Sequence, residues 1–486
     1  MRPQLKFLTY ELIQQIIYEA RNILANPGIE IHNEKALALL SGHGAKIDYN
    51  KLKVFINGDL IDKALATVPK SFKLFNAFES QTHDLSGANI HFTPGSSALN
   101  MLDYNTKKMR RPITEDYINY VKVTDQLQYI ASQSTAMIPS DVVENISDSY
   151  RLFLSLLYSA KPVVTGAFRV ESFELMKNML LAVRGSKQKL KDMPFSIFSC
   201  CPTSPLKWSN VTSQNVIDCA EYFIPVEFIA MPLSGFVAPV TLTGTLVQHT
   251  AETLSGIVIS QLANPGAPIL YGGSPAIFDI RYETTPMGAV ETMMIDCAYN
   301  EIGKYLGIPT QAYISLTDSK QLDVQAGFET GMGATFAALS GINNISGPGM
   351  IDFESCISLE KLVMDNELCG MMLRMVKGIE PKEDFPSLPR FEELLKDEHL
   401  LISKHTRKYL KEEIFFPGPV INRANNARWI EEGSSTMEER AHNQIEKLMK
   451  SYKPNPLPET TKAELVSLME TEAKLHGQDK LPVRNI

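Results

Sequence analysis

The sequence predicts an α/β protein: a (β/α)8 barrel of the TIM type with helical additions at its N- and C-termini. From about residue 90, short apolar or small-residue runs alternate with longer amphipathic helical patterns. Strands that alternate with helices of this length indicate βαβ units and a parallel sheet. Eight such units favour a closed barrel over an open doubly wound sheet, which remains the alternative. The predicted parts are an N-terminal helical segment (1–88), the barrel (89–379) and a C-terminal helical appendage (380–486).

The N-terminal segment is predicted to be helical and peripheral. Apolar residues recur at helical spacing through Leu8–Asn26 until Pro27 and Gly28 end the pattern. Two shorter helices are expected at Asn33–Ser41 and Asp59–Thr67. Nothing in this segment indicates a chemical function.

Eight runs in the middle of the chain are predicted to be strands, and a helical pattern follows each one. The strands are Ile90–Thr93, Tyr129–Ser132, Pro162–Thr165, Phe195–Ser199, Val226–Met231, Pro268–Tyr271, Thr310–Ser315 and Asn343–Ser346. The helices are Glu115–Leu127, Ser147–Ser159, Ser172–Arg184, Gln214–Tyr222, Thr243–Leu262, Ala289–Leu306, Val324–Ser340 and Leu359–Gly378. In Thr243–Leu262, for example, the apolar residues fall mainly on one face of the helix.

The tail begins with a Pro-rich, charged connector at Glu380–Pro389. Helices are expected at Phe391–Phe416 and at Met437–Tyr452. We expect them to wrap on the barrel.

Composition excludes several classes of protein. The formal net charge of −8 gives no reason to expect a nucleic-acid partner. No apolar run approaches the length of a membrane span, and no leader with an apolar core precedes the first helix, so a cytoplasmic protein is expected. The six cysteines form no C-x-x-C pair and the nine histidines do not cluster. We therefore expect no metal site, with the vicinal Cys200 and Cys201 most simply packed as thiols.

The segments that follow the predicted strands are rich in small residues, as at Gly272, Gly273 and Ser274. Small residues there let a large, flat partner approach the backbone closely. Phosphate-binding, zinc-protease and nucleophile-elbow motifs are not found, and no acid–base pair stands out. Several aromatic residues are also expected at these strand ends, and clustered ring faces suit a methylated ammonium ion. Each ring taken alone is more often part of a core.

Particular sequence motifs resemble those of the trimethylamine methyltransferase family. The central signature covers Met231–Gly244 (MPLSGFVAPVTLTG). Further matches are Gly266–Pro268 with Tyr271 and Gly272, Thr317–Lys320 leading into Asp323 and Gln325–Gly327, Leu362–Glu367, and Trp429 with Gly433. The similarity spans nearly the whole chain.

The resemblance implies a (β/α)8 enzyme that moves a methyl group from an amine to the cobalt of a corrinoid held by a separate small protein. One branch of the family carries pyrrolysine, whereas this sequence holds only standard residues. It is similar to the branch without pyrrolysine, whose members demethylate glycine betaine, proline betaine or carnitine in methanogenesis- or acetogenesis-type one-carbon metabolism. A quaternary ammonium has a neutral amine as its leaving group, so Co(I) can attack the methyl carbon without a general acid.

The expected partners are the cognate corrinoid protein, a small quaternary amine and other copies of the chain in a homo-oligomer. The alternative function is that of a non-catalytic barrel that binds a betaine or a corrinoid protein. Aromatic rings for the ammonium are predicted from Phe168, Phe236, Tyr271 and Tyr313. Asp318 is the predicted carboxylate that balances its charge, with an N-cap of the next helix as the equal alternative. The other predicted substrate-binding residues are Arg169, Gly272 and Ser274, with Arg281 and Lys320 as further cations for a betaine carboxylate.

Overall fold

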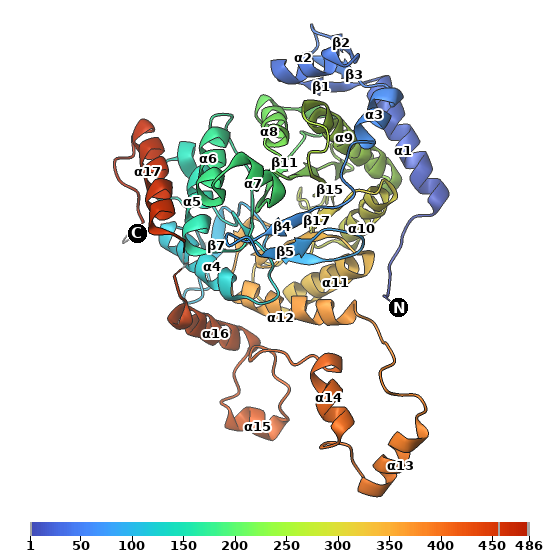
Figure 1. The fold of residues 1–486 in the computed structure, drawn as a ribbon, viewed down its shortest axis with the longest axis vertical. Helices are drawn as coiled ribbons and strands as arrows, with labels where there is room; N and C mark the ends of the chain where they lie inside the picture. Colours follow the sequence, from blue (N-terminus) through green and yellow to red (C-terminus); the bar gives the residue numbers. More distant parts are fainter. Residues whose placement is uncertain (1, 455–456, 484–486) are drawn as a thin grey trace.

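The protein has an α/β fold in which parallel strands alternate with helices (Figure 1). The computed structural model describes residues 2–454 and 457–483, so the outermost residues of both predicted terminal segments lie outside the described residues. The strands that match the eight predicted ones are β6 (His91–Thr93), β9 (Gln133–Ser134), β10 (Val163–Thr165), β11 (Ser196–Cys200), β13 (Val226–Ala230), β15 (Ile269–Gly273), β17 (Gln311–Tyr313) and β18 (Asn344–Ser346).

These strands form two parallel sheets whose edges meet. One sheet has the order β15-β13-β11-β10-β9 and the other has the order β17-β18-β6. Two isolated parallel bridges connect them: Tyr271 with Thr310 at one edge, and Phe92 with Ile130 at the other. Each strand therefore has a parallel partner on both sides.

A helix follows each of these strands, as the sequence predicted. The helices are α4 (Thr114–Gln126), α5 (Ser147–Tyr158), α6 (Ser172–Arg184), α8 (Asn210–Glu221), α9 (Leu242–Ala263), α10 (Val290–Tyr305), α11 (Val324–Ser340) and α12 (Leu359–Met375). Short elements between them are a 3-10 turn at Glu144–Ile146, α7 (Lys187–Asp192), β7 (Asn100–Leu102), β8 (Met109–Arg110), β12 (Lys207–Trp208), β14 (Leu233–Ser234), β16 (Ala276–Ile277), β19 (Met350–Ile351) and β20 (Cys356–Ile357). Helix α9 is buried on nearly all sides because α1, α3, α8 and α10 surround it.

Two strand predictions need correction. The strand predicted at Tyr129–Ser132 is instead β9, at Gln133–Ser134, and only the bridge at Ile130 lies in the predicted range. The strand predicted to end at Tyr271 continues through Gly272 and Gly273, which pair with Ile229 and Ala230 of β13. The neighbouring ladder keeps these two glycines extended, although a pair of glycines is typical of a turn.

The N-terminal segment contains strands as well as the expected helices α1 (Tyr10–Ala25), α2 (Glu34–Gly42) and α3 (Gly58–Leu65). Strands β1 (Ile29–Ile31), β2 (Lys46–Asp48) and β3 (Lys53–Phe55) form a small sheet with β12. The hairpin of β4 (Lys73–Phe75) and β5 (Gln81–Asp84) lies at the amino ends of the central strands. There Leu74 and Leu85 pack against side chains of β10, β11 and β15 in a separate apolar cluster.

The C-terminal part departs from the prediction at one helix. The single helix expected at Phe391–Phe416 is two helices, α13 (Leu388–Asp397) and α14 (Lys404–Glu413), which project away from the body in Figure 1. The second expected helix is α16 (Met437–Ser451), and α15 (Asn426–Glu431) and α17 (Glu459–Leu475) are additional. Helix α16 packs on α12, and α17 packs on α6. Among the described residues, no helix is long and apolar enough to cross a membrane.

Candidate functional site

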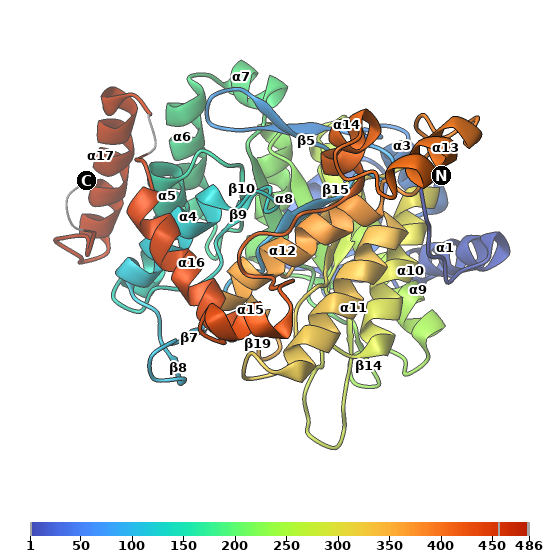
Figure 2. The ribbon, with the colours of Figure 1, turned by 90° about the horizontal axis from the view of Figure 1, so that it is seen from below.

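The carboxyl ends of the central strands face one side of the molecule. Figure 2 shows β7, β14 and β19, which follow three of these strands, towards its lower edge and β5 at the opposite side. Glu227 on β13 accepts a hydrogen bond from Asn344 on β18, in the other sheet. Both side chains therefore point into the space between the two sheets, and we call the region around Glu227 on the carboxyl side the strand-end site.

Glu227 is a fully buried carboxyl group at the second position of the otherwise apolar strand β13. Ser199 Oγ donates to its Oε1 at 2.7 Å, and Asn344 Nδ2 donates to its Oε2 at 3.2 Å. Burial raises the pKa of Glu227 to about 7, because removal from water disfavours the charged form more than these two neutral donors favour it.

Glu354 brings a second carboxyl group to the same site from the loop between β19 and β20. It is the last of three consecutive residues with positive φ, after Asp352 and Phe353, a conformation that is uncommon for residues other than glycine. The backbone N–H of Ser96 donates to Glu354 Oε1 at 3.2 Å. Burial, with a further contribution from the charge of Glu227, raises the pKa of Glu354 to about 8.

Tyr313 and Cys201 lie beside these two carboxyl groups. Burial raises the pKa of the Tyr313 phenol well above its usual value, and Glu227, Glu354 and Cys201 raise it further. Burial and the same two carboxyl groups raise the pKa of Cys201 to about 12. Among the described residues no ion pair is formed by Glu227 or Glu354. The site thus concentrates acidic groups and suits a ligand that supplies positive charge.

Gln311 and Gly272 shape the neighbouring wall. The Gln311 Oε1 atom accepts a hydrogen bond from the backbone N–H of Gly273 at 3.2 Å, whereas its buried Nε2 has no partner. A Cβ atom at position 272 would lie 2.5 Å from Gln311 Oε1. Gly272 therefore makes room for the carboxamide, and Nε2 remains available to a bound molecule or water.

Arg151 supplies a buried positive charge near the same loop. Its Nη1 donates to Ser97 Oγ at 3.1 Å and to Thr135 O at 2.8 Å, and its buried Nη2 has no partner. The guanidinium group lies 4.6 Å from the centre of the Phe168 ring. Ser97 follows Ser96, which binds Glu354, so a cation and a carboxyl group contact adjacent residues of one loop.

The four predicted aromatic residues do not form one cage. Tyr313 lies in the strand-end site. Phe168 and Phe236 lie at the surface, 46% and 66% exposed, and Phe236 stacks on Phe278 with ring centres 4.8 Å apart. Tyr271 points the other way, toward the helices: its hydroxyl donates to Thr250 Oγ1 of α9 at 3.0 Å. The Tyr271 side chain thus faces α9 and not the space that holds Glu227, because strand β15 extends past it and alternate side chains of a strand face opposite sides of the sheet.

Two of the predicted polar residues, Asp318 and Ser274, form hydrogen bonds with the backbone of neighbouring segments. Asp318 accepts hydrogen bonds from the backbone N–H groups of Met287 and Gly288, both at 2.9 Å, and burial raises its pKa to about 6. The N-cap of α11 is Asp323, so the alternative role predicted for Asp318, the N-cap of this helix, is wrong. Ser274 is buried at the end of β15, where its N–H donates to Ala230 O.

The cations predicted for a betaine carboxylate have other partners. Arg169 donates to Asn145 O and contacts His476, the residue that follows α17. Arg281 pairs with Asp279 at 2.5 Å on an exposed loop. Lys320 lies 3.7 Å from Asp352 and 3.9 Å from the centre of the Phe353 ring.

Sequence reasoning missed both carboxyl groups and Arg151. Glu227 carried a usable signal, because a single acid inside the apolar run VEFIA is buried on either face of a parallel sheet. No sequence signal pointed to Glu354 or Arg151, because an acidic residue in a loop and an arginine in a helix are usually exposed at the surface. No group of three or more His, Cys, Asp or Glu side chains suited to a metal ion is found among the described residues.

Comparisons with known proteins agree with the resemblance found in the sequence. The family model described as trimethylamine methyltransferase (MTTB) matches residues 1–475. The trimethylamine methyltransferase MttB of Desulfitobacterium hafniense is 28% identical over 94% of this chain and 91% of its own length. A glycine betaine methyltransferase of the same species is 28% identical over 98% of this chain and 99% of its own length.

The chain also aligns with a solved structure of an amine methyltransferase. The monomethylamine methyltransferase MtmB of Methanosarcina barkeri aligns with 92% of this chain and 89% of its own, at 13% identity and a TM-score of 0.47. The family assignment rests on the sequence match instead. Because that match covers nearly the whole chain, this protein belongs to the trimethylamine methyltransferase family.

Proposed function

We propose that this protein transfers a methyl group from a quaternary amine, glycine betaine or a related betaine, to the Co(I) corrinoid of a separate partner protein. The observation that carries the proposal is a pair of carboxyl groups with raised pKa values, fully buried Glu227 and partly buried Glu354, which have no ion-pair partner among the described residues. A substrate with a fixed positive charge supplies the missing partner. The full-length similarity to a glycine betaine methyltransferase supports the same class of substrate.

The scaffold that we propose is a closed (β/α)8 barrel formed by residues 89–379. The two edge bridges and the helix after each strand support this closure. In such barrels the reacting groups lie at the carboxyl ends of the strands, where Glu354 and Tyr313 meet. We further infer that residues 1–88 and 380–486 are additions to this barrel, the first of which closes its amino end with the β4–β5 hairpin.

Methyl transfer from a quaternary amine requires the protein to bind and orient the substrate and to balance its charge. The corrinoid, when bound, would supply a Co(I) nucleophile for the methyl group. The C–N bonding electrons would stay on nitrogen, and the demethylated donor would leave as a neutral tertiary amine. Glu354 and Glu227 balance the positive charge of the bound ammonium, and Tyr313 presents its ring to it. No proton has to move to the leaving nitrogen.

We propose that Arg151 receives the carboxylate of the betaine. Its unpartnered Nη2 and its position across Ser96 and Ser97 from Glu354 support this role. A zwitterion would then lie with its carboxylate toward Arg151 and its ammonium toward Glu354 and Tyr313. Phe168, stacked on the guanidinium and half exposed, would cover this end of the substrate.

The surface around the strand ends supports docking of a protein partner. Large apolar side chains are exposed on loops that follow β13 and β15 and on the first turns of α11; they are Met231, Phe236, Val240, Ile280, Tyr282, Val324 and Phe328. Large exposed apolar side chains gathered on neighbouring loops are typical of interaction sites. We propose that the corrinoid protein binds here and delivers its cofactor toward Tyr313.

A substrate screen tests the proposal. Purified protein is mixed with free cob(I)alamin and single amines, and loss of the Co(I) absorbance is followed. The panel contains glycine betaine, proline betaine, carnitine, choline, trimethylamine and dimethylglycine. We expect reaction with at least one betaine and much slower reaction with its tertiary amine product. Equal rates for glycine betaine and dimethylglycine contradict direct attack on a quaternary donor, and betaine binding without turnover identifies a binding protein.

A further inference from the structure

A cavity of about 500 Å³ lies on the side of the molecule opposite the strand-end site. Residues 2–8 run beside the ends of α10 and α11, where the Leu5 N–H donates to Leu339 O at 3.2 Å. These two helices end just before β17 and β18 begin, so the cavity lies at the amino ends of the strands. Gly87 and Ala88, in the loop before β6, complete its wall. We call it the amino-side cavity.

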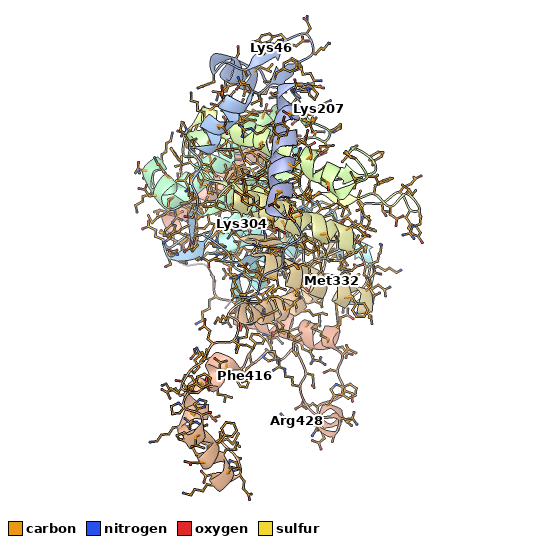
Figure 3. The ribbon with its side chains drawn as sticks, turned by 90° about the vertical axis from the view of Figure 1, so that its right-hand side faces the viewer. Lys46, Lys207, Lys304, Met332, Phe416 and Arg428 are labelled. Atoms are coloured by element: carbon orange, nitrogen blue, oxygen red, sulfur yellow. The ribbon has the colours of Figure 1, made fainter. Side chains whose placement is uncertain are left out.

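Lys304, in the last turn of α10, brings a partly buried cation to this cavity. Its Nζ donates to Gly87 O at 2.7 Å and to Asn343 Oδ1. Figure 3 views the molecule from the side that carries α1 and labels Lys304 within the body. Burial, with a further contribution from the positive charge of Arg2, lowers the pKa of Lys304 to about 7. The two acceptors therefore do not compensate the ammonium group for the removal of water.

Arg2 is a second cation on the same wall, and it also lacks a counter-ion. Its Nη2 donates to Ala338 O at 3.2 Å, and its buried Nε has no partner. Among the described residues, the hydrogen-bond partners of Arg2 and Lys304 are neutral oxygen atoms. Glu301, the acidic residue that lines the cavity, instead accepts two backbone N–H groups of the N-terminal segment. Two neighbouring cations removed from water are costly unless an anion binds between them.

We propose that the amino-side cavity binds a small organic anion with an apolar body, whose anionic head lies between Arg2 and Lys304. A guanidinium group beside an ammonium group suits the oxygens of a carboxylate or a phosphate. The side chains of Leu5, Ile13 and Leu339 line the same cavity and suit an apolar body. The volume falls within the range of roughly 300–1,000 Å³ that is typical of small-molecule sites. This inference does not depend on the proposed methyl transfer.

Isothermal titration calorimetry with small probe molecules tests the proposal on the full chain. Benzoate and phenyl phosphate each carry an anionic head on an apolar ring. Phenol carries the ring without the charge, and inorganic phosphate carries the charge without the ring. We expect at least one of the two ring-bearing anions to bind with a Kd below about 1 mM, and phenol and inorganic phosphate to bind at least about tenfold more weakly.

The variants Arg2→Met and Lys304→Met each remove one positive charge from the cavity and keep an unbranched side chain. Each should weaken binding of the ring-bearing anion at least about tenfold, because a charge-assisted contact is lost. The matched control is Lys207→Met on β12, where Lys207 lies 3.3 Å from Glu30, and it should leave the Kd unchanged. Figure 3 labels both lysines, Lys207 near the small N-terminal sheet and Lys304 nearer the middle of the molecule.

Circular dichroism of each variant shows whether the fold is retained. Arg2 precedes the first helix, so Arg2→Met decides the result if Lys304→Met does not fold. If neither ring-bearing anion binds wild-type protein with a Kd below about 10 mM, the proposal is overturned. Binding that the charge-removing variants leave unchanged also overturns it, because the anion then lies elsewhere. Phenol or inorganic phosphate that binds as tightly as the ring-bearing anions contradicts a ligand with both an anionic head and an apolar body.

Discussion

Replacing Glu354 by Gln tests the electrostatic account of the strand-end site most directly. The substitution keeps the shape of the side chain and an oxygen that can accept the Ser96 N–H, but removes the negative charge. A fixed positive charge about 4 Å from a carboxylate gains roughly 4 kcal/mol at an effective dielectric constant of about 20. Ionising Glu354 at pH 7, with its pKa about 8, costs about 1.4 kcal/mol of that gain.

The net expectation is a loss of roughly 2–3 kcal/mol in transition-state binding, which corresponds to a decrease of about 30- to 150-fold in kcat/KM at pH 7. Wild-type kcat/KM should rise about tenfold from pH 7 to pH 9 as Glu354 ionises, because the fixed charge binds only the carboxylate. In the Glu354→Gln variant, kcat/KM should not rise between pH 7 and pH 9, apart from the smaller rise that ionisation of Glu227 causes. The assay is loss of Co(I) absorbance with the best substrate of the screen.

The matched control is Glu301→Gln. Burial also raises the pKa of Glu301, but its carboxylate binds the backbone N–H groups of Phe7 and Leu8 beside α10. This variant should keep wild-type kcat/KM. If Glu354→Gln stays within twofold of wild type at both pH values, the carboxyl pair does not recognise the substrate and the reasoning fails.

Four further outcomes follow from the same geometry. Arg151→Met should raise KM for a betaine at least tenfold more than KM for tetramethylammonium, and equal effects on both would rule out a carboxylate contact. Glu227→Gln should gain thermal stability relative to wild type as pH rises from 5 to 8, by up to about 3 kcal/mol: the folded state, with its pKa about 7, holds a proton that the unfolded chain has lost above its ordinary value of 4.5. If the difference in melting temperature between Glu227→Gln and wild type is the same at pH 5 and pH 8, the pKa of Glu227 is not raised by burial. Gly272→Ala should lower the melting temperature and kcat/KM together, since overpacking against Gln311 costs about 1–3 kcal/mol; an unchanged kcat/KM means that Gln311 lies outside the site. Tyr271→Phe should lose about 1 kcal/mol of stability with its hydrogen bond to α9 and leave KM unchanged, and a tenfold rise in KM would show that the ring faces the substrate after all.

The order of strands and helices could be predicted from the sequence because each element depends on the hydrophobic pattern of its own residues. Each of the helices α4 to α12 that follows a central strand begins near its predicted start, where an apolar period of about 3.6 residues replaces a short apolar run. Strand ends were less certain. Gly272 and Gly273 are typical of a turn, yet pairing with β13 holds them in β15. That extension places Tyr271 within the strand, where its side chain faces α9.

The sequence by itself determined the α/β alternation, the family and the presence of Tyr313 near the strand ends, because these depend on neighbouring residues and on a motif. Only the tertiary structure decided which charged groups meet. Glu227 and Glu354 are far apart in the chain and come together because β13 and the loop after β19 border the same enclosed space. Removal of water raises the pKa of both groups, and the charge of Glu227 raises the pKa of Glu354 further; both effects require the folded chain to surround them.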